Sequence, residues 1–80
     1  MEEVRRLKEE GNLAFKEKRF PDAIESYSKA ILFDDTNHLL YSNRSMAHFH
    51  FGKFKESLKD AKRSIELNPK WSKVKKRKGR

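Results

Sequence analysis

Residues 4–37 read VRRLKEEGNLAFKEKRFPDAIESYSKAILFDDTN, and residues 38–71 repeat the pattern of this segment without a gap. A fixed period of 34 residues indicates a repeat protein, in which each unit is one supersecondary element that stacks on the next. The positions that the shift superimposes hold residues of the same kind: Phe15 and Phe49, Phe20 and Phe54, Ile24 and Leu58, Ile31 and Ile65, Ala23 and Ser57, Ala30 and Ser64.

Apolar and small residues recur within each unit at the period of an α-helix. Pro21 is tolerated in the first turn of a helix, and Gly52 follows a helix where a left-handed residue is favoured. No run of β-branched residues alternates with polar ones, so the predicted fold class is all-α. Five helices are predicted, over residues 3–17, 20–33, 37–50, 54–67 and 69–78. Their predicted inner faces hold Val4, Leu7, Gly11 and Ala14 in the first helix, Ala23, Ile24, Tyr27, Ala30 and Ile31 in the second, and Phe54, Leu58, Ala61 and Ile65 in the fourth.

Small residues occupy positions where two helices must approach closely, and large residues occupy positions that fill the space between them. The residues with this pattern are Leu7, Gly11, Phe15, Phe20, Ala23, Tyr27 and Ala30 in the first unit, and Tyr41, Phe49, Gly52, Phe54, Leu58, Ile65 and Pro69 in the second. They resemble the tetratricopeptide repeat, a helix–turn–helix unit. The resemblance implies helix–turn–helix repeats stacked as an α–α superhelix, in one domain over residues 1–80. Its parts are repeat 4–37, repeat 38–71, and a partial third repeat helix with a basic tail at 72–80.

Positions i, i+3, i+4 and i+7 of the first helix of each unit form a stripe on one face of that helix. The stripe holds Arg5, Lys8, Glu9 and Asn12 in the first unit, Leu39, Ser42, Asn43 and Met46 in the second, and Lys73, Lys76, Arg77 and Arg80 in the partial third. First helices line the concave surface of such a stack, so the stripes form one groove with Lys8, Asn12, Asn43, Lys73 and Arg77. Lysine, asparagine and arginine donors together suit carboxylates, with phosphate as the other candidate. The expected ligand also carries apolar side chains, because nearby positions hold Phe15, Met46, Phe49 and, at the rim, His50.

The same five donors match the two-carboxylate clamp of co-chaperone tetratricopeptide domains, most closely the first such domain of the chaperone-organising adaptor. That resemblance implies a peptide-binding adaptor for the C-terminal tails of the seventy- and ninety-kilodalton heat-shock chaperones, which end in Glu-Glu-Val-Asp. It further implies that the terminal carboxylate and the last Asp side chain are held by Lys8, Asn12, Asn43 and Lys73. Arg77 would contact the peptide further upstream.

Positive charge is concentrated at the end of the sequence. The chain has 20 Lys and Arg against 12 Asp and Glu, a formal charge of +8, and residues 70–80 hold seven basic residues and no acidic one. The cluster Lys75-Lys76-Arg77-Lys78 supports an alternative function, a nuclear-import signal or a nucleic-acid-binding patch on the repeat scaffold. Nucleic acid is the weaker prediction, because the repeats lack aromatic residues interleaved with basic ones.

Composition disfavours other classes of function. The chain has no cysteine, and His38, His48 and His50 form no i, i+4 pair beside a carboxylate, so a metal site is not expected. Serines without a His/Asp arrangement and the lack of a Gly-rich phosphate loop argue against catalysis and against a cofactor. No signal peptide or membrane span is recognisable, which predicts a cytoplasmic location, with the nucleus as the alternative, and no membrane partner. Weak self-association through the open C-terminal end is also expected.

Overall fold

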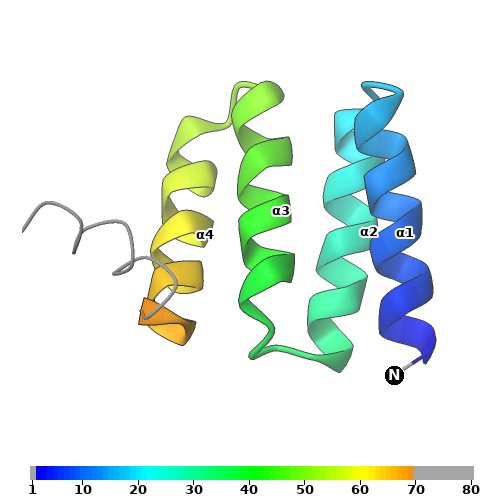
Figure 1. The fold of residues 1–80 in the computed structure, drawn as a ribbon. Helices are drawn as coiled ribbons and strands as arrows, with labels where there is room; N and C mark the ends of the chain where they lie inside the picture. Colours follow the sequence, from blue (N-terminus) through cyan, green and yellow to red (C-terminus); the bar gives the residue numbers. More distant parts are fainter. Residues whose placement is uncertain (1, 70–80) are drawn as a thin grey trace, which may run out of the picture.

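The computed structural model describes residues 2–69, which form four α-helices (Figure 1). They are α1 (Glu2–Lys16), α2 (Phe20–Phe33), α3 (His38–His50) and α4 (Phe54–Leu67). Each boundary lies within one residue of its prediction, and no strand occurs in residues 2–69, which confirms the all-α class. No helix in this range is long and apolar enough to cross a lipid bilayer. Apart from Pro69, the fifth predicted helix lies outside the described residues.

Local sequence explains where the helices begin and turn. The Asn37 side chain caps α3 by accepting a hydrogen bond of 3.1 Å from the backbone N–H of Leu39. Pro21 lies in the first turn of α2, as predicted. The turn inside each repeat contains a left-handed residue at the same register, Lys18 with φ of 62° and Gly52 with φ of 84°. Both repeats therefore use the same bend, although only the second has the residue that adopts it without strain.

The helices pack as two pairs, α1 with α2 and α3 with α4, and the pairs join where α2 meets α3 (Figure 1). The core of residues 2–69 has two clusters, and each combines residues from both repeats. The first cluster holds Val4, Leu7, Ala30, Ile31, Leu40 and Tyr41, and the second holds Ala14, Ala23, Tyr27 and Ala47. Because the repeats share both clusters, stacking between the units is what removes their apolar faces from water.

A close approach of α1 and α2 in the first repeat depends on a glycine. A Cβ on Gly11 would lie 2.6 Å from a ring carbon of Tyr27, which is buried. The equivalent pair in the second repeat is Ser45 and Ala61, where the aromatic ring is missing and a side chain fits. Ser45 donates a hydrogen bond of 2.8 Å to the carbonyl of Ser57. The serine departs from the repeat pattern, and the smaller partner across the crossing accommodates it.

The predicted burial of the apolar face of α4 is wrong for the described residues. Phe54, Leu58 and Ile65 are 61%, 60% and 45% exposed, whereas Ile31, the α2 equivalent of Ile65, is 8% exposed. The difference arises because α3 covers this face of α2, while no helix among residues 2–69 packs on the corresponding face of α4. The predicted inner face of α1, in contrast, is buried along its length.

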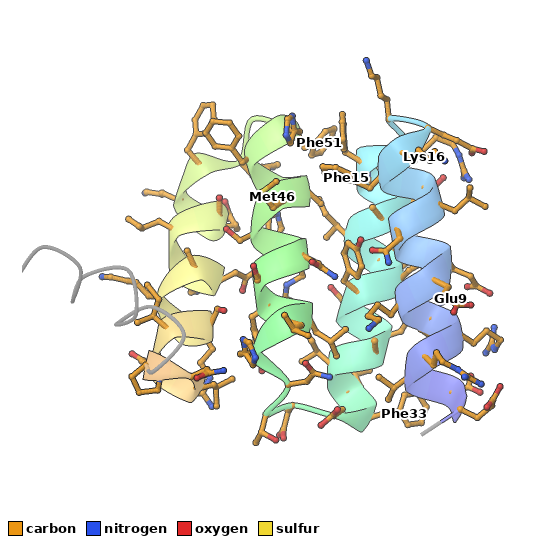
Figure 2. The ribbon with its side chains drawn as sticks, in the orientation of Figure 1. Glu9, Phe15, Lys16, Phe33, Met46 and Phe51 are labelled. Atoms are coloured by element: carbon orange, nitrogen blue, oxygen red, sulfur yellow. The ribbon has the colours of Figure 1, made fainter. Side chains whose placement is uncertain are left out.

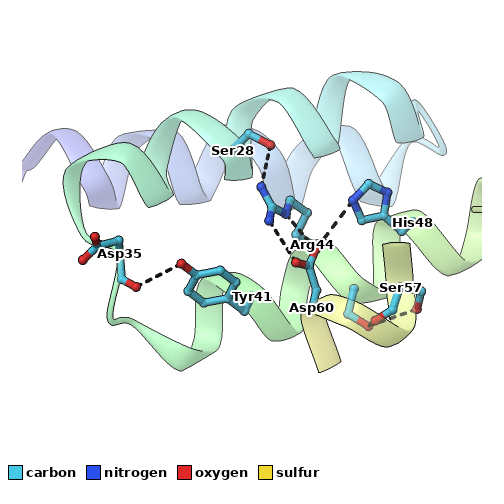
Figure 3. Close-up of polar contacts among 8 residues, drawn as sticks. Ser28, Asp35, Tyr41, Arg44, His48, Ser57 and Asp60 are labelled. Carbon is cyan, nitrogen blue, oxygen red and sulfur yellow. Dashed lines mark hydrogen bonds and ion pairs between the residues drawn. The ribbon is translucent and has the colours of Figure 1, made fainter. Parts of the chain in front are cut away.

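A buried ion pair joins the two helices of the second repeat, and its arginine also reaches the first repeat (Figure 3). Arg44 of α3 donates two hydrogen bonds to the Asp60 carboxylate of α4, at 2.7 and 2.9 Å, and a third of 3.0 Å to Ser28 Oγ of α2. The hydrogen bond to Asp60 raises the pKa of Arg44, so the guanidinium stays charged. His48 Nε2 lies 3.6 Å from the same carboxylate. Burial lowers the pKa of His48, against an opposing effect of Asp60.

Candidate functional site

A small pocket of about 120 Å³ lies between the two repeats on the side where α1 and α3 face each other. Asn12, Phe15, Tyr27, Asn43 and Met46 line it. Four of these residues were predicted for the groove, and the two asparagines come from successive first helices. Figure 2 shows Phe15 and Met46 at a similar height on α1 and α3, toward the end of the molecule that also holds Phe51. The structure therefore brings together amide donors and apolar surface from sequence positions about 30 residues apart.

Tyr27 orients one of the two asparagines. Its hydroxyl donates a hydrogen bond of 2.5 Å to Oδ1 of Asn12, across the contact between α2 and α1. Since the amide oxygen accepts this bond, the amide nitrogen of Asn12 keeps both of its N–H donors for other partners. Burial raises the pKa of Tyr27, so the hydroxyl keeps the proton that makes this bond.

Lys8 lies on the same face of α1, one turn before Asn12. It is half-buried, and within residues 2–69 its ammonium group makes no ion pair. The neighbouring arginines of α1 are already paired: Arg5 with Glu2 at 2.7 Å, and Arg6 with Glu3 and Glu10. Unlike Arg5 and Arg6, Lys8 therefore remains available to an incoming anion beside Asn12.

The aromatic residues predicted near the groove form a continuous set of ring contacts. The ring of His50 stacks on Phe20 at a centroid distance of 5.4 Å and meets the edges of Phe15 at 5.3 Å and Phe49 at 5.7 Å. Phe49 in turn contacts Phe54 at 5.3 Å. This set crosses from the turn of the first repeat to the turn of the second. His50 thus holds the two repeats together at the rim, where Phe49 is 55% exposed.

Two of the five predicted donors, Lys73 and Arg77, lie outside the described residues, as does the basic cluster at 75–78. Their part in a binding site stays a prediction. The structure places the remaining three on α1 and α3, the first helices of the two repeats, with Asn12 and Asn43 in one pocket and Lys8 one turn away from Asn12. Within residues 2–69 no group of three or more His, Cys, Asp or Glu could hold a metal ion.

Sequence reasoning missed two features that support this site. The first is the Tyr27 hydroxyl, because the tyrosine was interpreted only as a core residue. The second is the pair of Arg44 and Asp60, which fixes α3 against α4 and thereby the position of Asn43, one residue before Arg44. A signal for the second feature existed, since an aspartate on the inward side of an amphipathic helix is rarely buried without a charged partner.

No model of a protein family matches this sequence. The first tetratricopeptide domain of Spaghetti (RPAP3), solved with the HSP90 peptide SRMEEVD, matches with a TM-score of 0.82 and 34% identity, covering 85% of this chain and 54% of that one. The chain has the fold of a tetratricopeptide-repeat domain. Heat shock protein STI1 of Saccharomyces cerevisiae is 46% identical over 67 residues, and Hsp70-Hsp90 organizing protein 2 of Arabidopsis thaliana is 44% identical over 66. Each match covers 82% of the domain, which spans only 11% and 12% of these two relatives.

Proposed function

We propose that this tetratricopeptide-repeat domain is a non-enzymatic, cytoplasmic adaptor that binds the acidic C-terminal tails of heat-shock chaperones of the seventy- and ninety-kilodalton classes. Residues 1–80 act as one domain in this proposal, and the ligand lies in the groove between α1 and α3. The observation that carries it is the pocket in which Asn12 and Asn43, from successive first helices, face the same space beside Phe15 and Met46.

The chemistry of the described residues favours a carboxylate ligand. Two asparagine amides and one lysine supply donors, and no acidic residue lines the pocket. Asn12 is already oriented by Tyr27, so binding does not have to immobilise that side chain. A chain terminus that ends in aspartate offers two carboxylates, which can accept charge-assisted hydrogen bonds from Lys8 and from both amides at once. In the proposed site, Lys73 and Arg77 add two further cations.

The comparisons support the same ligand class. The similar domain of RPAP3 was solved with a peptide ending in Glu-Glu-Val-Asp, and the name of the Arabidopsis relative refers to both chaperone classes. An apolar side chain is also expected in the ligand, because Phe15 and Met46 offer apolar surface next to the donors. The affinity expected for a short peptide that loses chain entropy on docking is about micromolar.

The test is a calorimetric titration of the 80-residue chain with a peptide that ends in Glu-Glu-Val-Asp, as free acid and as C-terminal amide. The free acid binds, and the amide, which lacks the terminal charge, binds at least about tenfold more weakly. Lys8→Ala and Asn43→Ala each weaken the binding of the free-acid peptide by about 1–3 kcal/mol, the range for hydrogen bonds to charged groups.

Lys29→Ala is the matched control for the loss of one positive charge. Lys29 lies on α2, 57% exposed and 3.7 Å from Glu25, and does not line the pocket. Its removal leaves the affinity unchanged within about twofold. If the amide and the free acid bind equally well, or if Lys29→Ala weakens binding as much as Lys8→Ala does, the groove assignment fails.

A further inference from the structure

The two asparagines of the pocket differ in how their amide groups are held. Oδ1 of Asn12 accepts the hydrogen bond of 2.5 Å from the Tyr27 hydroxyl, whereas the amide of Asn43 makes no hydrogen bond within residues 2–69. The repeat offers no equivalent support in its second unit, because the residue of α4 that corresponds to Tyr27 is Ala61, which has no hydroxyl. Of the two pocket amides, therefore, the structure holds that of Asn12 in one orientation and leaves that of Asn43 able to turn.

Reversal of the Asn12 amide, which exchanges its oxygen and its nitrogen, is unfavourable. The reversed amide would donate to the oxygen of Tyr27, and the hydroxyl proton would then have no acceptor among the described residues. Tyr27 is 2% exposed, so little solvent reaches it to replace that acceptor. A buried donor without a partner costs more than a typical hydrogen bond contributes. Asn12 is thereby fixed as a hydrogen-bond donor toward the pocket.

This fixed donor restricts the chemical groups that the pocket can bind. Lys8 has donors and no acceptor, and Asn12 behaves in the same way toward the pocket. A carboxylate offers two acceptor oxygens, which match both side chains. A carboxamide has an amino group in place of one oxygen, so a ligand donor would face a donor of the protein. Asn43 can meet either kind of group, because its amide can turn.

We propose that Tyr27 is a positioning residue that determines the selectivity of the pocket: by holding Asn12 as a donor, it makes the pocket reject ligand ends that carry an N–H donor. An amidated C-terminus is then disfavoured for two separate reasons. It lacks the terminal charge, and its hydrogen-bonding groups do not match the pocket. The second reason depends on the Tyr27 hydroxyl. This inference rests on the proposed function, since it concerns the ligand of the same groove.

Tyr27→Phe tests the proposal, because it removes the hydroxyl and keeps the ring. Calorimetric titrations of the 80-residue chain with a peptide that ends in Glu-Glu-Val-Asp, as free acid and as C-terminal amide, give the ratio of the two affinities. In the variant the Asn12 amide can adopt either orientation, so the free acid binds about fivefold more weakly. The amide stays within about twofold of its wild-type affinity, and the preference for the free acid falls about fivefold. A general loss of structure would weaken both peptides alike and leave the ratio unchanged.

Tyr41→Phe is the matched control. Tyr41 is also buried, and its hydroxyl donates a hydrogen bond of 3.0 Å to the carbonyl of Asp35, away from the pocket. Loss of this hydroxyl leaves the ratio of the two affinities unchanged. In an Asn12→Ala background, Tyr27→Phe has no further effect on the ratio, because no amide remains to be oriented. Circular dichroism verifies that each variant remains helical.

The outcomes separate this proposal from the proposed function. If the wild-type chain prefers the free acid and Tyr27→Phe keeps that preference in full, the role of Tyr27 is wrong and the groove assignment stands. If the wild-type chain binds the two peptides equally well, the groove assignment fails and the proposal fails with it. An equal decrease of the preference in the wild-type and Asn12→Ala backgrounds would also overturn the proposal, since the effect would not pass through the amide of Asn12.

Discussion

Removal of the Asp60 carboxylate should lower the stability of the domain by more than the removal of any exposed ion pair does. Asp60 is 9% exposed in its side chain, and its two oxygens accept both hydrogen bonds from Arg44, which is 22% exposed. Asp60→Ala leaves this guanidinium largely out of water, with Ser28 as its remaining hydrogen-bond partner among residues 2–69. Breaking a buried pair by removing one member costs about 3–5 kcal/mol. Because Arg44 can regain some hydration, we expect about 2–3 kcal/mol here.

Urea unfolding followed by circular dichroism at the helix band measures this loss. Small domains have total stabilities near 0.05–0.15 kcal/mol per residue, so the predicted loss is between about one sixth and three quarters of the total. With a urea dependence of about 1 kcal/mol per molar, the unfolding midpoint falls by about 2–3 M while the slope is unchanged. A changed slope would indicate loss of two-state unfolding instead of a simple loss of stability.

Glu66→Ala serves as the control on the same helix. Glu66 is 66% exposed and pairs with Arg63 at 3.3 Å, an arrangement whose removal shifts stability by well under about 1 kcal/mol. The double variant Arg44→Met with Asp60→Leu should recover most of the loss, since apolar replacement removes both charges together. The argument for a stabilising buried ion pair is refuted if Asp60→Ala shifts the midpoint no more than Glu66→Ala does. It is also refuted if the double variant loses as much stability as the sum of the losses measured for the two single variants.

Two other predictions concern packing and pH. Gly11→Ala should destabilise the domain by about 1–3 kcal/mol, despite the gain of about 1 kcal/mol in helix propensity, because the new Cβ meets the Tyr27 ring at 2.6 Å. In a Tyr27→Ala background the same change should be neutral or stabilising in urea titrations, and an equal loss in both backgrounds would contradict the packing argument. Burial lowers the pKa of His48 in the folded domain below its ordinary value of 6.5, so the unfolded chain takes up a proton first. Stability should therefore decrease as pH falls below about 6.5, and His48→Gln should flatten this dependence in thermal melts at pH 5 to 7. An unchanged slope in that variant would assign the dependence to other groups.

Much of the fold follows from the sequence because the relevant signals are local or periodic. The repeat of 34 residues, the helical period within it and the positions of Pro21 and Gly52 place four helices to within one residue at each end. The same period places Lys8 and Asn12 on one face of α1, since residues four apart in a helix are neighbours whatever surrounds them. That Asn12 and Asn43 share a pocket was also predictable, because stacking puts equivalent faces of successive units side by side.

Contacts between helices were decided by the tertiary structure. Two examples are the hydrogen bond from Tyr27 to Asn12 and the ion pair of Arg44 with Asp60. Both depend on how two helices are rotated relative to each other and how closely they cross, and no pattern along a single helix specifies these quantities. The exposure of Phe54, Leu58 and Ile65 likewise could not be predicted from the pattern along a single helix. A helical period shows which side of α4 is apolar, but burial of that side requires a neighbouring element, and only the arrangement of all helices in space shows whether one is there.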